Sequence, residues 1–226
     1  MSPSPRSPGR TARPRPSGRL VAVEGIDGTG KTTLMSQLLR ALRSRGWKVA
    51  RWQEPSDGPL GRAAREASGS DPAQAALLFT LDRGSERARL EKILQKSDLV
   101  LSDRSFYSTL AYQGSVLSPR ERRGLETLQR VVARRPDLVL WLDLTPARAM
   151  ERISSRGAVR SPLERLGTLR RVSGAYRWYA RSERRRFVRL DASRPPEEVC
   201  AAAQKAILAR WKAPRRGKAG PRGARL

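Results

Sequence analysis

The sequence contains no histidine and only one cysteine, Cys200. Without histidine the protein lacks the side chain that most often serves as a general base or binds a metal, which disfavours triad hydrolases and zinc enzymes. Phosphoryl transfer loses little, because it depends mainly on positioning and on charge stabilisation. A single cysteine excludes an internal disulfide and fits a reducing compartment.

Long apolar runs are also missing from the sequence. No stretch approaches the roughly 20 apolar residues that a membrane-spanning helix needs. The N-terminal residues lack the apolar core of a signal peptide. We therefore expect a protein without a membrane segment that works in the cytoplasm.

Positive charge is in excess, with 47 Lys and Arg against 21 Asp and Glu, a net charge of +26 over 226 residues. Residues 1–18 and 212–226 are basic, contain no acidic residue and have few apolar side chains. Such composition predicts two disordered basic tails. Between them, residues 19–211 are long enough for one domain with a full core.

The strongest motif follows the apolar run of residues 20–23 and reads G-I-D-G-T-G-K-T over residues 25–32. This fits the phosphate-binding loop, in which glycines let backbone N–H groups surround a polyphosphate at the N-terminus of a helix. We expect Lys31 to reach the terminal phosphates and the Thr32 hydroxyl to bind magnesium. The alternative is a glycine-rich turn with a solvated lysine. The predicted ATP-binding residues are Gly25, Ile26, Asp27, Gly28, Thr29, Gly30, Lys31, Thr32 and Thr33.

Strand and helix patterns alternate along the chain. Leucines recur at helical spacing over residues 34–42, before Gly46. Short apolar runs typical of buried strands follow at residues 47–52, 99–103, 138–143 and 187–191. Helical patterns occupy residues 71–94, 119–134 and 195–211. This alternation predicts an α/β P-loop NTPase fold, a parallel five-stranded sheet flanked by helices on both faces.

Asp103 is the last residue of one of these apolar runs. An acid at the carboxyl end of a buried strand is where a P-loop protein places its magnesium-side carboxylate. An Asp after an apolar run is also a common turn or helix-capping residue. The residue types alone leave both interpretations open.

Residues 103–114 read D-R-S-F-Y-S-T-L-A-Y-Q-G, which fits the pattern D-R-x-x-x-S-x-x-A-Y-Q-G. Together with Glu24-Gly25, Glu54-Pro55 and L-F-T-L-D-R at residues 78–83, this segment resembles the thymidylate kinase family of nucleoside monophosphate kinases. The resemblance covers about residues 19–210 and keeps the order of every motif. It implies transfer of the γ-phosphoryl group of ATP to dTMP, giving dTDP and ADP, with Mg²⁺ as cofactor.

The resemblance also implies a role for each matching residue. Phe79 would stack on thymine, Arg83 would donate hydrogen bonds to the base, and Tyr112 would lie under the sugar. Ser108 and Gln113 would complete recognition of the pyrimidine edge. For Phe79, Tyr112 and Tyr107 the alternative is core packing. The implied substrate-binding residues are Glu54, Phe79, Arg83, Arg104, Ser108, Tyr112 and Gln113.

Charged residues would handle the phosphates. The resemblance implies that Arg104 grips the acceptor phosphate, and that Asp27 and Asp103 manage the magnesium ion and the attacking phosphate oxygens. The predicted metal ligands are Thr32 and Asp103.

Residues 155–165 resemble the short lid of the family, a glycine-broken, arginine-rich loop between two helices. Some family members carry an arginine inside the phosphate loop, at the place that Gly28 occupies here. Since the transferred phosphoryl group needs a cation, Arg156 and Arg160 are the candidate catalytic residues, with Arg165 a weaker choice. A solvated basic loop is the alternative.

Gln53 departs from the family pattern, which usually has an arginine before the Glu-Pro pair. A neutral amide there would weaken the grip on the acceptor phosphate. A nearby arginine could substitute, or the preferred acceptor could differ. The candidates for substitution are Arg51, Arg62 and Arg65.

Two other functions fit parts of the sequence. One is a related kinase for another nucleotide or a deoxynucleoside. The other is a nucleic-acid-binding protein that keeps the P-loop fold, suggested by the basic tails, which we expect to make only non-specific contacts. The family resemblance further implies a homodimer formed through helices packed face to face.

Overall fold

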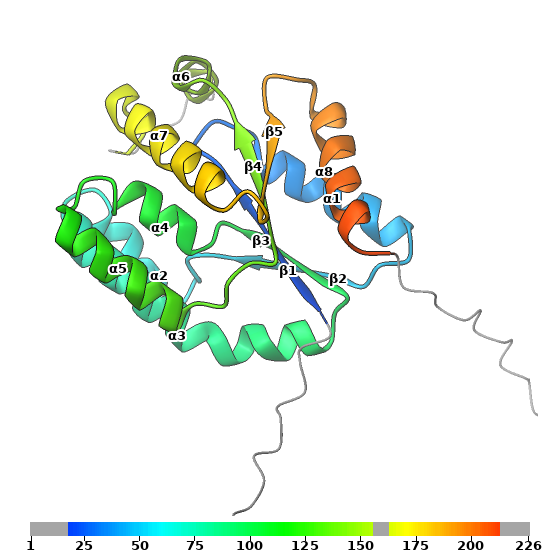
Figure 1. Cartoon of the computed structure of the whole chain (residues 1–226), viewed down its shortest axis with the longest axis horizontal. Helices are drawn as coiled ribbons and strands as arrows, with labels where there is room; N and C mark the ends of the chain where they lie inside the picture. Colours follow the sequence, from blue (N-terminus) through cyan, green and yellow to red (C-terminus); the bar gives the residue numbers. More distant parts are fainter. Residues whose placement is uncertain (1–17, 156–162, 213–226) are drawn as a thin grey trace, which may run out of the picture.

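The structure is a computed structural model that describes residues 18–155 and 163–212. Five strands form one sheet in the order β2-β3-β1-β4-β5, and every neighbouring pair is parallel. This confirms the predicted fold (Figure 1). The strands are β1 (Arg19–Glu24), β2 (Val49–Gln53), β3 (Leu99–Asp103), β4 (Leu138–Asp143) and β5 (Phe187–Asp191).

Helices connect the strands, and four of the eight described helices begin at a residue whose side chain caps them. The Asp71 carboxylate accepts hydrogen bonds from the first backbone N–H groups of α3, and Ser118 and Glu121 form a capping box on α5. These contacts explain why the predicted helix starts are correct. The helices are α1 (Lys31–Ser44), α2 (Pro59–Ala67), α3 (Pro72–Gln95), α4 (Phe106–Tyr112), α5 (Pro119–Val132), α6 (Pro146–Ser154), α7 (Leu166–Ser182) and α8 (Pro196–Arg210).

The second strand begins two residues later than the sequence predicted. The Trp47 N–H donates to the Leu42 carbonyl oxygen and so belongs to the end of α1, while the Lys48 N–H donates to the Asp98 carboxylate. The ladder with β3 pairs Val49 with Leu99. Because Trp47 and Lys48 donate their N–H groups to residues outside the predicted strand, the strand begins only at Val49.

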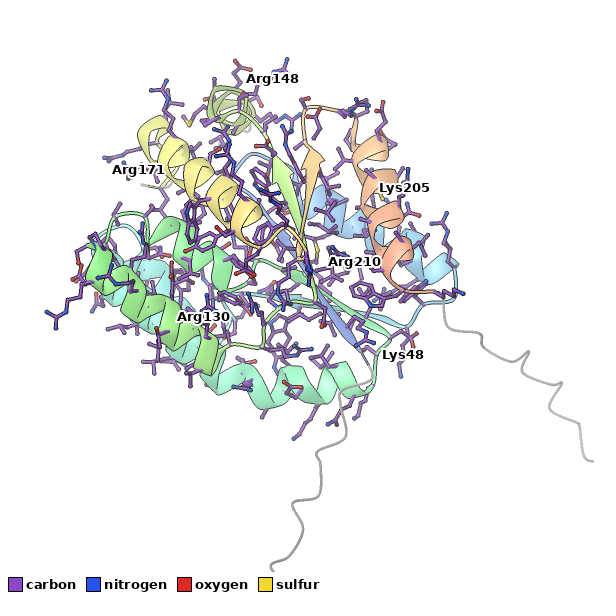
Figure 2. All side chains as sticks on the ribbon, viewed as in Figure 1. Lys48, Arg130, Arg148, Arg171, Lys205 and Arg210 are labelled. Carbon is purple, nitrogen blue, oxygen red and sulfur yellow. The ribbon has the colours of Figure 1, made fainter. Side chains whose placement is uncertain are left out.

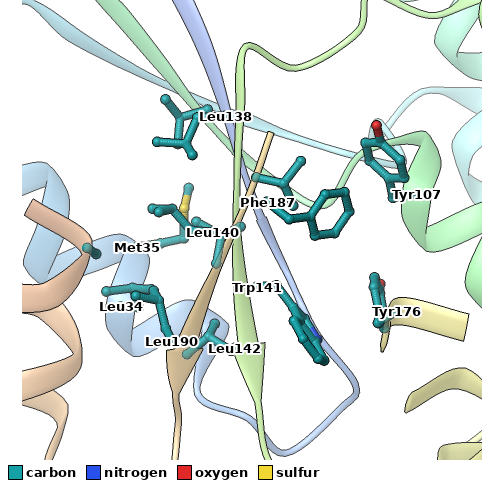
Figure 3. Close-up of a cluster of buried hydrophobic side chains, with 14 of the residues drawn as sticks. Leu34, Met35, Tyr107, Leu138, Leu140, Trp141, Leu142, Tyr176, Phe187 and Leu190 are labelled. Atoms are coloured by element: carbon teal, nitrogen blue, oxygen red, sulfur yellow. The ribbon is translucent and has the colours of Figure 1, made fainter. Parts of the chain in front are cut away.

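Both faces of the sheet are covered, so the three central strands are buried except at the exposed first residue of β1 and the partly buried last residues of β3 and β4. Figure 3 shows Leu34 and Met35 of α1 on one side of β4, and Tyr107 of α4 on the other. The Tyr107 ring packs edge-on against Phe187 of β5, with ring centroids 4.9 Å apart. The two-layer core fixes the carboxyl ends of the strands, where ligands of such sheets bind.

Several predictions about the ends and the lid fall on residues 1–17, 156–162 and 213–226, which lie outside the described residues. Gly18, placed in the predicted N-terminal tail, is described and buried, and its N–H donates to the Leu94 carbonyl oxygen. A Cβ atom on Gly18 would approach that oxygen to 2.4 Å. In the described part of the chain, none of the helices has the length and apolar character needed to cross a membrane.

Candidate active site

The phosphate loop connects β1 to α1 and has the glycine conformations that its motif requires. Gly28 and Gly30 have φ angles of 84° and 89°, a region that side chains with a Cβ rarely adopt. A Cβ on Gly28 would also come within 2.5 Å of the Ala149 carbonyl oxygen of α6. The loop therefore has no room for an arginine at this place.

Lys31, the first residue of α1, folds back over the loop. Its Nζ atom donates to the carbonyl oxygens of Gly25 and Ile26, both at 3.0 Å, and lies 3.4 Å from Asp27 Oδ1. Burial and the nearby Arg104 cation lower the pKa of Lys31 to about 8, against the opposing effect of nearby acids. The charge of Lys31 thus depends on its burial and on the Arg104 cation and the acids around it.

The predicted metal ligands come from two elements. Thr32 and Thr33 are exposed in the first turn of α1. Asp103 ends β3, in register with Val23 of β1 and Gln53 of β2, so its carboxylate emerges beside the phosphate loop. The described residues contain no cluster of three acidic, cysteine or histidine side chains of the kind that holds a metal by itself.

Asp27 and Arg104 form an ion pair at the centre of the site. The Tyr112 hydroxyl donates to Asp27 Oδ2 at 2.9 Å, and the Arg104 guanidinium lies over the Tyr112 ring, 5.2 Å from its centroid. Although burial acts in the opposite direction, Arg104 and Lys31 hold the pKa of Asp27 well below its ordinary value. Asp27 is thus an anion, paired with two cations.

A cavity of about 350 Å³ opens beside this ion pair. All seven residues that the resemblance implied for the substrate line it, although they come from separate parts of the chain. Asp27 lines it too, which places the cavity directly next to the phosphate loop. The other lining residues are Pro55, Arg65, Ser68, Ser105, Thr109 and Leu163.

Arg83 is buried in the wall of this cavity and fixed by three hydrogen bonds. It donates from Nε to Glu54 Oε2 at 2.7 Å, from Nη1 to Gln129 Oε1 at 2.7 Å, and from Nη2 to Thr109 Oγ1 at 3.2 Å. A guanidinium has five N–H groups, so each terminal nitrogen keeps one for a ligand. Gln129, which the sequence analysis missed, is itself held by Thr80.

Ser108 and Gln113 are buried residues of the cavity wall. The Ser108 hydroxyl donates to Glu24 Oε2 at 2.7 Å, and Tyr176 of α7 contacts the same carboxylate. No role was predicted for either Glu24 or Tyr176. A signal for Glu24 was present, since this acid directly follows the apolar run of residues 20–23.

Gln53 does not line the cavity, because its side-chain amide donates to Asp57 at 3.0 Å on the exposed side of β2. Of the three arginines that could substitute, only Arg65 is in the described cavity wall. Its Nη1 atom donates to the Ser56 carbonyl oxygen at 3.0 Å. The helix α2 therefore brings a cation into the cavity wall, where Arg65 also lies 3.6 Å from Asp57.

The predicted lid, residues 155–165, is only partly within the described residues. The candidate catalytic arginines, Arg156 and Arg160, lie outside the described residues. Arg165 is exposed at the N-cap of α7, and Leu163 lines the cavity. The described C-terminal part of the predicted lid therefore reaches the cavity wall through Leu163.

Comparison with known proteins points to one family. The family model described as thymidylate kinase matches residues 23–203. A probable thymidylate kinase of Archaeoglobus fulgidus is 34% identical over 190 residues, covering 83% of this chain and 94% of that protein. A probable thymidylate kinase of Pyrobaculum aerophilum is 39% identical over 186 residues, covering 80% and 92%. A thymidylate kinase of Synechococcus is 36% identical over 208 residues, covering 85% and 97%.

Proposed function

The chain belongs to the thymidylate kinase family and phosphorylates dTMP with ATP, and we propose that the phosphate loop and the adjoining cavity are the two substrate sites of this reaction. The observation that carries the proposal is the convergence of all seven implied substrate residues on one cavity that shares Asp27 with the loop. Donor and acceptor phosphates bound there would face each other across the Asp27–Arg104 pair.

The loop is the proposed donor site. Its backbone N–H groups and the N-terminus of α1 suit the polyphosphate of ATP. Lys31 would meet the charge that grows on the transferred phosphoryl group, because its ammonium already lies over the loop. In phosphoryl transfer the protein contributes mainly by positioning the substrates and neutralising charge.

The cavity is the proposed acceptor site. Phe79 would stack on thymine, and the two remaining terminal N–H groups of Arg83 would reach the base. Arg104 would hold the phosphate of dTMP, supported by Arg65 in place of the arginine usual at Gln53. Tyr112, whose hydroxyl is fixed on Asp27, would form the floor under the deoxyribose.

Magnesium is the proposed cofactor. The Thr32 hydroxyl and the Asp103 carboxylate supply hard oxygen donors beside the phosphate loop. Mg²⁺ typically takes only one or two protein ligands and completes its shell with phosphate oxygens and water, so this small donor set fits the ion. A magnesium ion held by Thr32 and Asp103 would supply positive charge that neutralises the ATP phosphates.

The catalytic cation is proposed to come from Arg156 or Arg160, outside the described residues. The packing of Gly28 against Ala149 supports this proposal, since an arginine cannot occupy the loop. The position of Leu163, a described residue of the predicted lid, in the cavity wall also supports this proposal.

A homodimer is proposed through α3 and α5. Both helices carry large apolar side chains whose exposed fractions run from 37% to 69%. The two helices pack together, with Arg87 of α3 donating to the Val131 carbonyl oxygen of α5. An exposed apolar cluster on paired helices is typical of an interface. Its residues are Leu77, Leu81, Leu128 and Val131.

Non-specific contact of the two basic tails with nucleic acid remains our expectation, as a side property of the kinase. Within the described domain, Figure 2 shows labelled basic side chains projecting from several different elements. This spread gives no specific support to a nucleic-acid-binding protein as the main function. We also propose the cytoplasm as the place of action, on the basis of the nucleotide substrates and the free, buried Cys200.

A coupled ADP-release assay of the full chain against a panel of nucleoside monophosphates tests the proposed function. We expect dTMP to give the highest kcat/KM, with dUMP, AMP, CMP and GMP well below it. The Lys31→Ala variant, measured at the same concentration, excludes a contaminating kinase. A clear preference for another monophosphate would overturn the assignment of the cavity to thymine.

A further inference from the structure

Glu24 is a buried acid for which the reaction as described has no use. It is the last residue of β1, directly before the phosphate loop, and it has no exposed surface. Three hydroxyl groups surround it, with Ser105 Oγ at 2.7 Å from Oε1, and Ser108 Oγ and Tyr176 OH each at 2.7 Å from Oε2. Because a buried carboxylate is costly unless it is hydrogen-bonded, these partners stabilise it where it lies.

The contacts of Glu24 fix the first turn of α4. Ser105 is the N-cap of this helix and also accepts a hydrogen bond from the Tyr107 N–H at 3.3 Å. Ser108 lies one turn further on. The two serines bind different oxygens of the same carboxylate, so both the position and the rotation of α4 are set relative to β1.

Tyr176 connects a third element to the same point. It lies on α7 with no exposed surface, and its hydroxyl contacts Glu24 Oε2 at 2.7 Å and Ser108 Oγ at 3.0 Å. Burial raises the pKa of Glu24, and hydrogen bonds from Ser108, Ser105 and Tyr176 offset this rise only in part. The hydroxyls therefore favour the carboxylate form, which is the form that accepts all three hydrogen bonds.

Arg104 is joined to this cluster through Ser108. Its backbone has a φ angle of 70°, unusual for a residue with a side chain, and its N–H donates to the Val23 carbonyl oxygen at 3.1 Å. Its Nη1 atom donates to Ser108 Oγ at 3.2 Å. Because the hydroxyl hydrogen of Ser108 points to Glu24, the Ser108 lone pairs are free to accept from Arg104.

We propose that Glu24 and Tyr176 are positioning residues that orient the Arg104 guanidinium toward the acceptor phosphate: Tyr176 holds the Glu24 carboxylate, and the carboxylate fixes the Ser108 hydroxyl that accepts from Arg104. This inference rests on the proposed role of Arg104 as the ligand of the dTMP phosphate. It also changes the role of Ser108, whose single hydrogen is committed to Glu24 and so is not offered to the thymine base.

The Tyr176→Phe variant tests the proposal, because it removes one hydroxyl and keeps the ring that fills the core. Tyr179→Phe is the matched control, since Tyr179 is also buried on α7 and donates to a carboxylate, Glu126, at 3.0 Å outside the cavity. Calorimetry without ATP gives the dTMP dissociation constant, and steady-state kinetics give KM for both substrates. We expect Tyr176→Phe to raise the dTMP dissociation constant and KM about fivefold, with the ATP KM unchanged, and Tyr179→Phe to change none of them.

Two further variants separate this proposal from the one it rests on. Glu24→Gln should raise the dTMP dissociation constant and KM more than Tyr176→Phe does, because it disturbs all three hydroxyls. In an Arg104→Lys background, the effect of Tyr176→Phe should largely disappear, since residues that act through one another are not additive.

If Arg104→Lys itself leaves dTMP binding intact, the proposed function of Arg104 is wrong. If Arg104→Lys weakens dTMP binding while Tyr176→Phe and Glu24→Gln bind it as tightly as Tyr179→Phe does, the positioning role is overturned. Full additivity of Tyr176→Phe with Arg104→Lys would overturn it as well. In each comparison the melting temperature reports folding separately from binding.

Discussion

The Nζ atom of Lys31 donates to the Gly25 carbonyl oxygen at 3.0 Å, so the lysine lies across the loop whose backbone precedes it. Asp27 Oδ1, at 3.4 Å from the same nitrogen, is also paired with Arg104. The Asp27 carboxylate therefore lies between Lys31, which we assign to the ATP phosphates, and Arg104, which we assign to the dTMP phosphate. The active site is organised around this alternation of charge.

Replacing Lys31 by alanine should nearly abolish phosphoryl transfer. The lysine meets charge that develops in the transition state, and loss of one such donor typically lowers kcat by about a hundredfold or more. Turnover of Lys31→Ala is measured by ADP release at saturating ATP and dTMP, with circular dichroism to show that the variant is folded. A rate above about a tenth of the wild-type value would contradict the role of Lys31.

ATP binding should weaken as the pH rises through about 8, the pKa of Lys31. Burial and Arg104 lower this pKa, so that in the free enzyme the ammonium is charged at pH 7 and about nine-tenths neutral at pH 9. Bound phosphates favour the charged form, so binding at pH 9 must take up a proton and is expected to be about tenfold weaker than at pH 7. Calorimetry in buffers of different ionisation enthalpy measures both quantities.

Lys31→Arg is the control for this pH effect, because a guanidinium keeps its charge across the range. Its ATP affinity, even if lower, should not change between pH 7 and pH 9. An equal pH dependence in wild type and Lys31→Arg would show that another group is responsible.

Arg65 should contribute to dTMP binding. Since it lines the cavity where Gln53 does not, Arg65→Ala is expected to raise the dTMP KM by up to about tenfold, with the ATP KM unchanged. Arg62→Ala is the matched control, because Arg62 lies on the same helix outside the cavity wall and donates to the Asp57 carbonyl oxygen. Equal dTMP KM values for the two variants would show that Arg65 does not substitute for the arginine that the family usually has at the position of Gln53.

The lid arginines should act mainly on kcat. Arg156→Ala or Arg160→Ala is expected to lower kcat by roughly a thousandfold with little change in the dTMP KM, because an arginine that stabilises the transferred phosphoryl group acts in the transition state. Arg171→Ala, an exposed arginine of α7, should have no effect. Near-wild-type kcat values for both lid variants and for their double variant would rule out this source of the cation and direct attention to Arg104 or Arg165.

The apolar face of α3 and α5 should control the oligomeric state. The double variant Leu81→Glu, Val131→Glu places charge on two side chains that are more than half exposed, at 58% and 69%, so it should be a folded monomer in light scattering after size exclusion. Lys205→Glu on α8 is the control for a change of surface charge. A wild-type chain that is itself monomeric at micromolar concentration would remove the basis for the proposed interface.

The fold was predictable because its signals are local. The apolar run of residues 99–103, the Asp71–Pro72 helix start and the loop of residues 25–32 each carry their structure within a few neighbouring residues. The errors in the predicted bounds were small and occurred where a residue distant in sequence determines the end of an element. Trp47 and Lys48, predicted in the second strand, instead donate hydrogen bonds to the end of α1 and to Asp98.

The sequence alone predicted the backbone shape of the loop at residues 25–32, because the motif and the spacing of its glycines encode that shape. The tertiary structure alone decided that Arg65 rather than Arg51 or Arg62 reaches the cavity, since that depends on how α2 packs. It alone also revealed the carboxylate of Glu24 between Ser108 and Tyr176, which lie 84 and 152 residues away along the chain. Local patterns cannot encode such contacts, because a buried polar cluster exists only when separate elements close around it.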